Sequence, residues 1–409
     1  MNTLLKGTEK MQLHARRSGW AQFRLIAGTS LVAVVAYLST AVAQEAAAPQ
    51  NAATAQAEFE RVNAEWKEAL EEIKQIQVEY QTAEEAEKPA LRERFQELLP
   101  KVRAKADELT AAAERAYQAA PNQDAEVTDL LLSAASNHVM DDRYEDALRI
   151  SRVLIDGKVN SPQIYPFGAV SAFETHQYDL AQQYLQKAAE QGVLDPGQAQ
   201  NNAALSQIVQ RALQAQVQFD ATRRLWAEEQ KIRAAEAEAD DLPRVKFQTN
   251  EGEIVIELFE NQAPNSVANF ISLVEKGFYD GTPFHRVLPG FMAQGGDPTG
   301  SGSGGPGHHI ACECYRDDAR HHFRGTLSMA HAGRDTGGSQ FFLTFVRTSH
   351  LDGKHTAFGR VIEGLDVLSR IQRIDPQQPS GAQPDEIVKA TVVRKRDHEY
   401  QPKTLPATR

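Results

Sequence analysis

The fold of the C-terminal part of this chain is decided by the stretch FHRVLPGFMAQGGD, residues 284–297. Upstream of it, apolar and polar residues alternate over 245–249 and again over 254–258, with Asn250-Glu251-Gly252 between the two runs. Two alternating runs joined by a short glycine-containing turn predict a β-hairpin.

Between this hairpin and the deciding stretch, helix signals run from Pro264 to Lys276. Proline lies near the first turn and Gly277 at the stop. The chain after Gly277 is glycine-dense and contains short β-prone runs such as Gln340–Phe345. Together these patterns predict an antiparallel β-barrel with two helices.

Further motifs follow the deciding stretch in a fixed order: LSMA at 327–330, GSQFF at 338–342, LDGKH at 351–355 and FG at 358–359. With residues 284–297 they resemble the cyclophilin family of peptidyl-prolyl cis–trans isomerases, over residues 243–396. The resemblance implies a closed antiparallel β-barrel with two helices, and an enzyme that rotates X–Pro peptide bonds.

Rotation about an X–Pro bond must overcome an amide resonance barrier of roughly 18–20 kcal/mol. No bond to a heavy atom is made or broken, so the chemistry requires no nucleophile, metal or cofactor. The catalyst must bind the twisted amide better than either planar form. In that state the prolyl nitrogen can accept a hydrogen bond, which suits a charged, multi-donor guanidinium. We expect Arg286 to be this catalytic residue, and it also matches the family's catalytic arginine.

The resemblance also implies the residues that bind substrate. An apolar slot for the proline ring is expected from aromatic and thioether side chains, together with one leucine. Gln294 matches a residue that hydrogen-bonds the substrate backbone. The full predicted substrate-binding set is Phe291, Met292, Gln294, Ala330, His331, Gln340, Phe342, Leu351 and His355. His331 and His350 depart from the family pattern, which has asparagine at the first position and, in many eukaryotic members, tryptophan at the second.

Two other motifs are weighed as ligand sites. Residues 300–305 satisfy G-x-G-x-x-G, but Pro306-Gly307 follows where a dinucleotide site needs a helix, so a surface loop is expected. Residues 308–322 hold four histidines and the only two cysteines, Cys312 and Cys314, without a standard zinc-finger spacing. We expect a polar loop there, and we expect no metal ion or cofactor. The alternative is a zinc or copper site.

The net charge of −11 argues against a nucleic-acid partner, because binding phosphates requires a basic face.

The N-terminus reads as a targeting segment, residues 1–43. Arg16, Arg17 and Arg24 precede an uncharged stretch from Leu25 to Ala43, which ends in the cleavage-like Ala-Val-Ala. A cleaved signal peptide is expected. The alternatives are an uncleaved anchor, in which residues 25–43 tether the chain to the membrane, and a twin-arginine signal. The first two readings place the protein in the periplasm or on the outer face of the cytoplasmic membrane of a bacterium.

After an Ala- and Gln-rich linker at 44–56, residues 57–120 carry heptad patterning. Phe59, Trp66, Ile73 and Tyr80 recur every seven residues, and Lys88-Pro89 interrupts the pattern. This predicts a coiled-coil-like antiparallel hairpin, and the alternative is one long helix kinked at the proline.

Residues 121–241 contain a weak repeat, in which Tyr144 and Tyr178, like Ala147 and Ala181, are 34 residues apart. Paired helices with this period resemble the tetratricopeptide repeat, although two units are fewer than usual. The alternative is a generic helical bundle. Residues 397–409 are expected to form a solvated tail.

The sequence as a whole predicts a multidomain α plus β protein, with an all-α N-terminal region before the barrel. We expect a folding catalyst for exported, proline-containing polypeptides, with a helical region that tethers it or recruits clients or a partner protein. Two alternatives stay open: a module that binds a proline-containing loop without turnover, and a helical assembly protein with an ancillary barrel.

Overall fold

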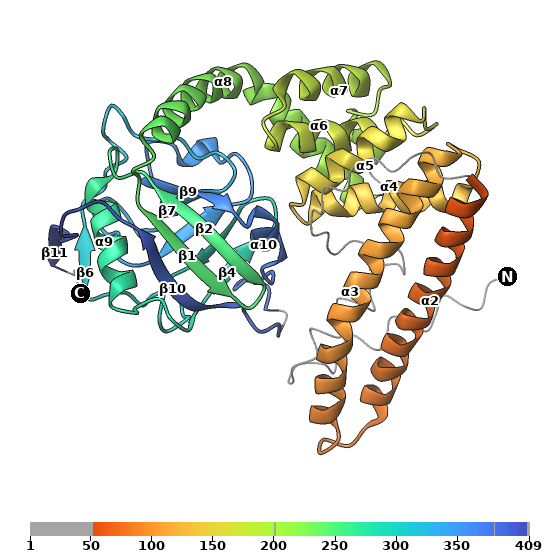
Figure 1. Ribbon diagram of the computed structural model, residues 1–409, viewed down its shortest axis with the longest axis horizontal. Coiled ribbons are helices and arrows are strands. Elements are labelled where there is room, and N and C mark those ends of the chain that lie inside the picture. Colours follow the sequence, from red (N-terminus) through yellow and green to blue (C-terminus); the bar gives the residue numbers. More distant parts are fainter. Residues whose placement is uncertain (1–51, 200–201, 380, 407–409) are drawn as a thin grey trace.

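The computed structural model describes residues 52–199, 202–379 and 381–406 of the 409-residue chain. Figure 1 shows a helical region, which comprises α2 to α8, and a β-rich domain that begins at β1. The predicted leader and tether, and the first part of the 44–56 linker, lie outside the described residues. Within the described ranges, no helix combines the length and the apolar composition needed to cross a membrane.

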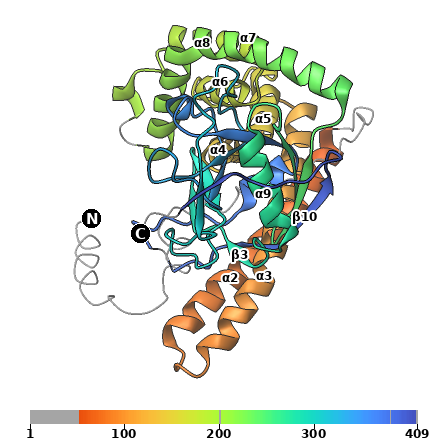
Figure 2. The same cartoon turned by 90° about the vertical axis from the view of Figure 1, so that its left-hand side faces the viewer.

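Helices α2 (Ala52–Thr82) and α3 (Lys88–Ala119) lie side by side as a hairpin that projects from the molecule (Figures 1 and 2). The apolar residues of the predicted seam are buried between them: Phe59, Trp66, Ile73, Tyr80, Phe95, Leu98, Val102 and Leu109. The chain reverses at residues 83–87, and Pro89 occupies the first turn of α3, where no helical hydrogen bond is lost. This region therefore forms two helices and not one kinked helix.

Two helix pairs follow the hairpin: α4 (Ala125–Met140) with α5 (Tyr144–Asp156), and α6 (Ile164–Glu174) with α7 (Tyr178–Glu190). The turn within each pair is alike, because Asp142 and His176 both have positive φ, 63° and 61°. Tyr144 and Tyr178 then begin the second helix with buried rings. The 34-residue offset thus corresponds to a repeated turn, while assignment to the tetratricopeptide family stays a prediction. A short 3-10 helix, η2 (Pro196–Ala199), precedes α8 (Ala203–Ala239).

The β-rich domain is built on a nine-stranded antiparallel sheet with the order β3-β10-β1-β2-β9-β7-β8-β5-β4. The strands are β1 (Arg244–Thr249), β2 (Gly252–Leu258), β3 (Thr282–Pro283), β4 (Arg286–Leu288), β5 (Met292–Gly295), β7 (Thr326–Met329), β8 (Phe341–Thr344), β9 (Ala357–Glu363) and β10 (Glu386–Arg394). The sheet curls into a half-barrel (Figure 1). In the described part of the chain no ladder joins the end strands β3 and β4, so complete closure stays a prediction.

Two helices, α9 (Pro264–Glu275) and α10 (Leu365–Arg370), accompany the sheet, as the sequence predicts. The core beneath them is aromatic, and the Phe270 ring lies 5.1 to 5.8 Å from those of Tyr279, Phe341 and Phe358. Offset and edge-on aromatic contacts of this kind stabilise a core beyond the area that they bury.

The C-terminal segment is not the free tail that the sequence suggests. The ring of Tyr400 is buried, and its hydroxyl donates to Glu260 Oε2 at 2.7 Å. A short strand, β11 (Thr404–Pro406), then pairs with β6 (His308–Ile310). The basic residues before it suggested solvation, but the buried Tyr400 ring and the pairing of β11 with β6 hold the segment on the domain.

The helical region and the β-rich domain meet along α8, through buried ion pairs. Arg320 Nη2 lies 2.6 Å from Glu229 Oε1, with only 1% and 4% of the side chains exposed. Arg360 Nη1 lies 2.7 Å from Glu236 Oε2. The Trp226 ring of α8 also packs on Phe323, with centroids 4.9 Å apart. We call this contact between the two parts the junction.

Candidate active site

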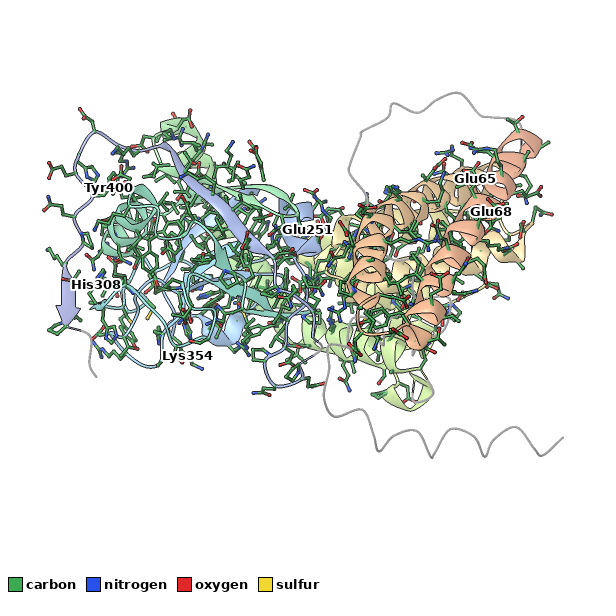
Figure 3. All side chains as sticks on the ribbon, turned by 90° about the horizontal axis from the view of Figure 1, so that it is seen from below. Glu65, Glu68, Glu251, His308, Lys354 and Tyr400 are labelled. Carbon is green, nitrogen blue, oxygen red and sulfur yellow. The ribbon has the colours of Figure 1, made fainter. Side chains whose placement is uncertain are left out.

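The structure brings all ten predicted site residues together around one cleft of about 800 Å³ in the β-rich domain. They come from β4, β5 and the turn between them, from the segment after β7, from β8 and the residue before it, and from a short 3-10 helix, η3 (Ser349–Leu351), with the loop after it. These residues are Arg286, Phe291, Met292, Gln294, Ala330, His331, Gln340, Phe342, Leu351 and His355. Figure 3 shows His308, which also lines the cleft, on the β-rich domain and far from the hairpin that carries Glu65 and Glu68.

Arg286 and Gln294 stand next to each other because β4 and β5 pair them in register. Arg286 is half-buried, and its guanidinium carbon lies 5.8 Å from the centroid of the Phe291 ring. Its guanidinium makes no hydrogen bond or ion pair with the described residues. The cleft therefore holds a cationic, multi-donor group that is free to meet an acceptor on a ligand.

Apolar side chains beside Arg286 form the predicted slot. Met292 and Phe342 are 1% and 5% exposed and form its floor, while Phe291 and Leu351 are half-buried at its sides. The imidazole of His350 packs on Phe291, with centroids 5.7 Å apart. His350, which stands where many eukaryotic members of the family carry tryptophan, thus still places an aromatic ring beside Phe291.

The glycine-rich loop that matched G-x-G-x-x-G forms one wall of the cleft. Gln294 Nε2 donates to Gln340 Oε1 at 3.0 Å, and Gln340 Nε2 donates to the carbonyls of Gly302 and Gly304 at 3.0 and 2.9 Å. Burial opposes ionisation of Asp297, but the backbone amides of Gly304 and Thr299 outweigh it and lower the pKa of that carboxyl to about 2. A charged, caged aspartate therefore fixes the shape of this loop.

Two histidines stack on the opposite wall. The rings of His331 and His355 are 4.1 Å apart and tilted by 16°. His355 Nδ1 lies 2.9 Å from the Met329 carbonyl, and burial lowers the pKa of its imidazole. His331 Nε2 lies 2.8 Å from the Lys354 carbonyl. Backbone carbonyls therefore orient both rings, and both residues line the cleft.

Sequence reasoning did not identify the network behind Phe342. His322 is buried, stacks on the Phe342 ring, and has Nδ1 2.9 Å from Asp352 Oδ1 and Nε2 2.8 Å from Ser328 Oγ. Burial lowers the pKa of His322. Burial also opposes ionisation of Asp352, yet His321, His322 and Arg347 lower the pKa of that carboxyl well below its usual range. The LDGKH motif already contained one member of this network, Asp352, which directly follows the slot residue Leu351.

The histidines and cysteines of residues 308–322 are dispersed in space. His308 Nε2 contacts Asn269 Oδ1 at the cleft, whereas His322 lies behind Phe342. Both cysteines are free thiols, and burial raises the pKa of each. Across the described ranges, no group of three or more His, Cys, Asp or Glu side chains is placed to hold a metal ion.

Comparison with known proteins matches residues 244–392 to the family described as cyclophilin type peptidyl-prolyl cis-trans isomerase/CLD. A peptidyl-prolyl cis-trans isomerase from Helicobacter pylori is 52% identical over 149 residues, which are 35% of this chain and 91% of that protein. One from Synechococcus elongatus is 58% identical over 131 residues, 32% of this chain and 88% of that protein. The crystal structure of a Cryptosporidium parvum cyclophilin type peptidyl-prolyl cis-trans isomerase aligns with a TM-score of 0.35 and 34% identity, over 38% of this chain and 99% of that chain.

Proposed function

Because the chain belongs to the cyclophilin-type peptidyl-prolyl cis-trans isomerase family, we propose that the cleft rotates X–Pro peptide bonds with Arg286 as its catalytic residue. The observation that carries this proposal is a guanidinium that has no hydrogen-bond or ion-pair partner among the described residues and lies beside a preformed apolar slot. The enzyme class follows from the family, while the role of each residue in the cleft is our proposal.

The proline ring enters the slot between Phe291 and Leu351, over Met292 and Phe342. As the amide twists, its resonance is lost and the prolyl nitrogen regains a lone pair. Arg286 donates a hydrogen bond to that nitrogen, an interaction that neither planar form can make equally well. An acceleration on the order of 10⁵ requires about 7 kcal/mol of such preferential stabilisation.

The remaining residues orient the substrate. Gln294 hydrogen-bonds the peptide backbone beside the arginine, and Gln340 holds Gln294 in place through its side-chain oxygen. Ala330, His331 and His355 contact the residues that precede proline. All these contacts are made to groups that do not react, so they set orientation and affinity.

The test is a prolyl isomerisation assay on the full chain with a proline tetrapeptide. Arg286→Ala should lower kcat/KM at least about tenfold, since a transition-state hydrogen bond is lost. Arg334→Ala is the matched control, because Arg334 is exposed and packs on Tyr315 outside the cleft. Equal exchange rates with and without wild-type protein would instead favour a module that binds prolines without turnover.

We further propose that the protein acts on exported polypeptides, at the periplasmic side of a bacterial envelope. The supporting feature is the basic, apolar and small-residue pattern of residues 1–43. Cell fractionation and N-terminal sequencing of the purified protein test this. A mature N-terminus at Gln44 supports a cleaved signal peptide, whereas an intact leader in the membrane fraction supports a tether at 25–43.

The helical region is proposed to recruit clients or a partner protein through its tetratricopeptide-like pairs. The repeated turn at Asp142 and His176 supports this proposal. Cross-linking in cell envelopes tests it, with the full-length protein compared with a variant in which exposed residues of α4 to α7 are changed. A cross-linking pattern identical for both would argue against recruitment through these helix pairs.

A further inference from the structure

We propose that Asp142 and Glu174, both in the helical region, are positioning residues for the isomerase cleft. Each accepts a backbone hydrogen bond from a segment that carries one wall of the cleft. This inference rests on the proposed isomerase function, and it makes the helical region part of the active site's support.

The first contact fixes the turn that carries Phe291. Asp142 is 1% exposed, and its carboxylate accepts from the backbone N–H of Gly290, with the two oxygens 2.9 and 3.1 Å away. Arg373 Nη2, at 3.1 Å, and the hydroxyl of Tyr144, at 2.9 Å, hold the same carboxylate. Because these donors fix the carboxylate, it in turn fixes the residue that precedes Phe291.

The side chain of Arg211 packs closely against the same turn. Gly290 has φ +67°, and a Cβ built there would lie 2.3 Å from Arg211 Nη2 of α8. Arg211 is itself held, because its Nη1 donates to the Val139 carbonyl at 2.9 Å. Beyond the turn, the Phe291 carbonyl accepts from the N–H of Phe345 at 2.9 Å. The turn that carries Phe291 is therefore held between the helical region and the residue that follows β8.

The second contact supports the floor of the cleft at Phe342 and the wall at Leu351. Glu174 Oε2 accepts from the backbone N–H of Arg347 at 2.9 Å, and both residues are buried. The Arg347 guanidinium donates to the His322 carbonyl at 2.9 Å and pairs with Asp352, the residue after Leu351. Glu174 thus fixes the residue that organises the network behind Phe342 and the loop that carries Leu351.

A third contact supports the same loop. Ser349 Oγ lies 3.0 Å from Gln218 Oε1 of α8. Ser349 begins η3, which ends at Leu351. Two walls of the cleft, at Phe291 and at Leu351, therefore depend on residues that lie more than 100 positions away in the chain.

Glu236 provides a matched control, because it contributes to the junction but does not contact a described residue that lines the cleft. Glu236 is 8% exposed, the same fraction as Glu174. Its carboxylate pairs with Arg320 and Arg360, neither of which lines the cleft. Loss of Glu236 should weaken the junction without moving Phe291 or Leu351.

The experiment compares Asp142→Ala, Glu174→Ala and Glu236→Ala in the full chain, well below their melting temperatures. Two readouts are used: kcat/KM for a proline tetrapeptide, and hydrogen–deuterium exchange of the peptides that contain Gly290 and Arg347. We expect kcat/KM to fall about tenfold in Asp142→Ala and about fivefold in Glu174→Ala, with faster exchange at the corresponding amide. Glu236→Ala should keep kcat/KM within about twofold even where its melting temperature falls.

Conservative variants separate positioning from folding. Asp142→Asn and Glu174→Gln keep an accepting oxygen, so they should recover most of the activity and of the amide protection. They also keep the test available if an alanine variant fails to fold. The proposal is overturned if folded Asp142→Ala and Glu174→Ala keep wild-type kcat/KM and exchange, or if Glu236→Ala loses as much activity. A wild-type chain without isomerase activity would refute the proposed function instead, and the exchange data would still test whether these residues fix the turns.

Discussion

The hairpin and the junction use charged residues in opposite ways. On the hairpin, Arg94 of α3 reaches Glu72 and Glu79 of α2 at 3.3 Å, and all three side chains are 38 to 47% exposed. At the junction, Arg320 and Glu229 are 1% and 4% exposed. Water screens the first set, whereas the second set has lost its hydration and depends on its partners. An apolar seam thus holds the hairpin, whereas the junction combines buried ion pairs with the packing of Trp226 on Phe323.

The largest effect that this comparison predicts comes from Arg320→Ala. Its removal leaves Glu229 and Glu236 buried without that partner, a change that typically costs about 3–5 kcal/mol. Urea unfolding followed by tryptophan fluorescence measures it, since Trp226 packs at the junction. A loss below about 1 kcal/mol would mean that water enters the junction and that the contrast with the hairpin does not hold.

A smaller effect is expected where the junction meets the cleft. Gly290→Ala places a side chain at φ +67° and against Arg211 Nη2, whereas Gly353→Ala at φ +69° meets nothing within 4 Å. Left-handed backbone alone costs about 1–2 kcal/mol, so both variants lose that amount and Gly290→Ala loses more. Equal melting temperatures for the two variants would show that Arg211 moves away freely.

Titration of the Glu174 carboxyl should make the stability of the protein depend on pH. Burial raises the pKa of its carboxyl to about 7, from an ordinary value of 4.5, although the Arg347 amide and nearby arginines oppose the shift. Between pH 4.5 and 7 the folded state therefore binds a proton that the unfolded state has released, so stability falls as the pH rises across this interval and levels off above about 7. Between pH 6 and 8 this group should remove about 1 kcal/mol.

Glu174→Gln isolates that contribution, because other buried groups titrate too. Burial lowers the pKa of His138 and His176 to about 3, so those groups destabilise the fold as the pH falls below their ordinary values. The variant should match wild type only below about pH 4.5, should already be more stable at pH 6, and should gain about 1 kcal/mol more by pH 8. A constant difference between the two proteins across this range would contradict the assignment to Glu174.

The smallest effect is expected on the hairpin surface. Arg94→Ala should change the free energy of unfolding by about 0.5 kcal/mol or less, because exposed pairs contribute little. The same urea titration serves as the measurement, with 1 M salt added to screen what remains. A loss as large as that of Arg320→Ala would show that exposure does not distinguish the two regions.

The cleft could be predicted from sequence because its residues are concentrated in short motifs. Residues 284–297 supply Arg286, Phe291, Met292 and Gln294. Because β4 and β5 are joined by a short turn and pair with each other, these four residues lie close together. The hairpin could also be predicted from sequence, since apolar residues that recur every seven positions form a buried seam between packed helices. The prediction failed for the C-terminal segment, where Tyr400 packs against the domain although its neighbours are polar.

By itself, the sequence determined the isomerase domain, its ten cleft residues and the helical character of residues 57–239. Only the tertiary structure decided that His322, which looked like a candidate metal ligand, lies behind Phe342, and that Asp142 and Glu174 hold two walls of the cleft. The physical reason is distance along the chain. Local patterns fix which face of a helix or strand is buried, whereas a contact between residues 148 positions apart depends on how two preformed parts pack together.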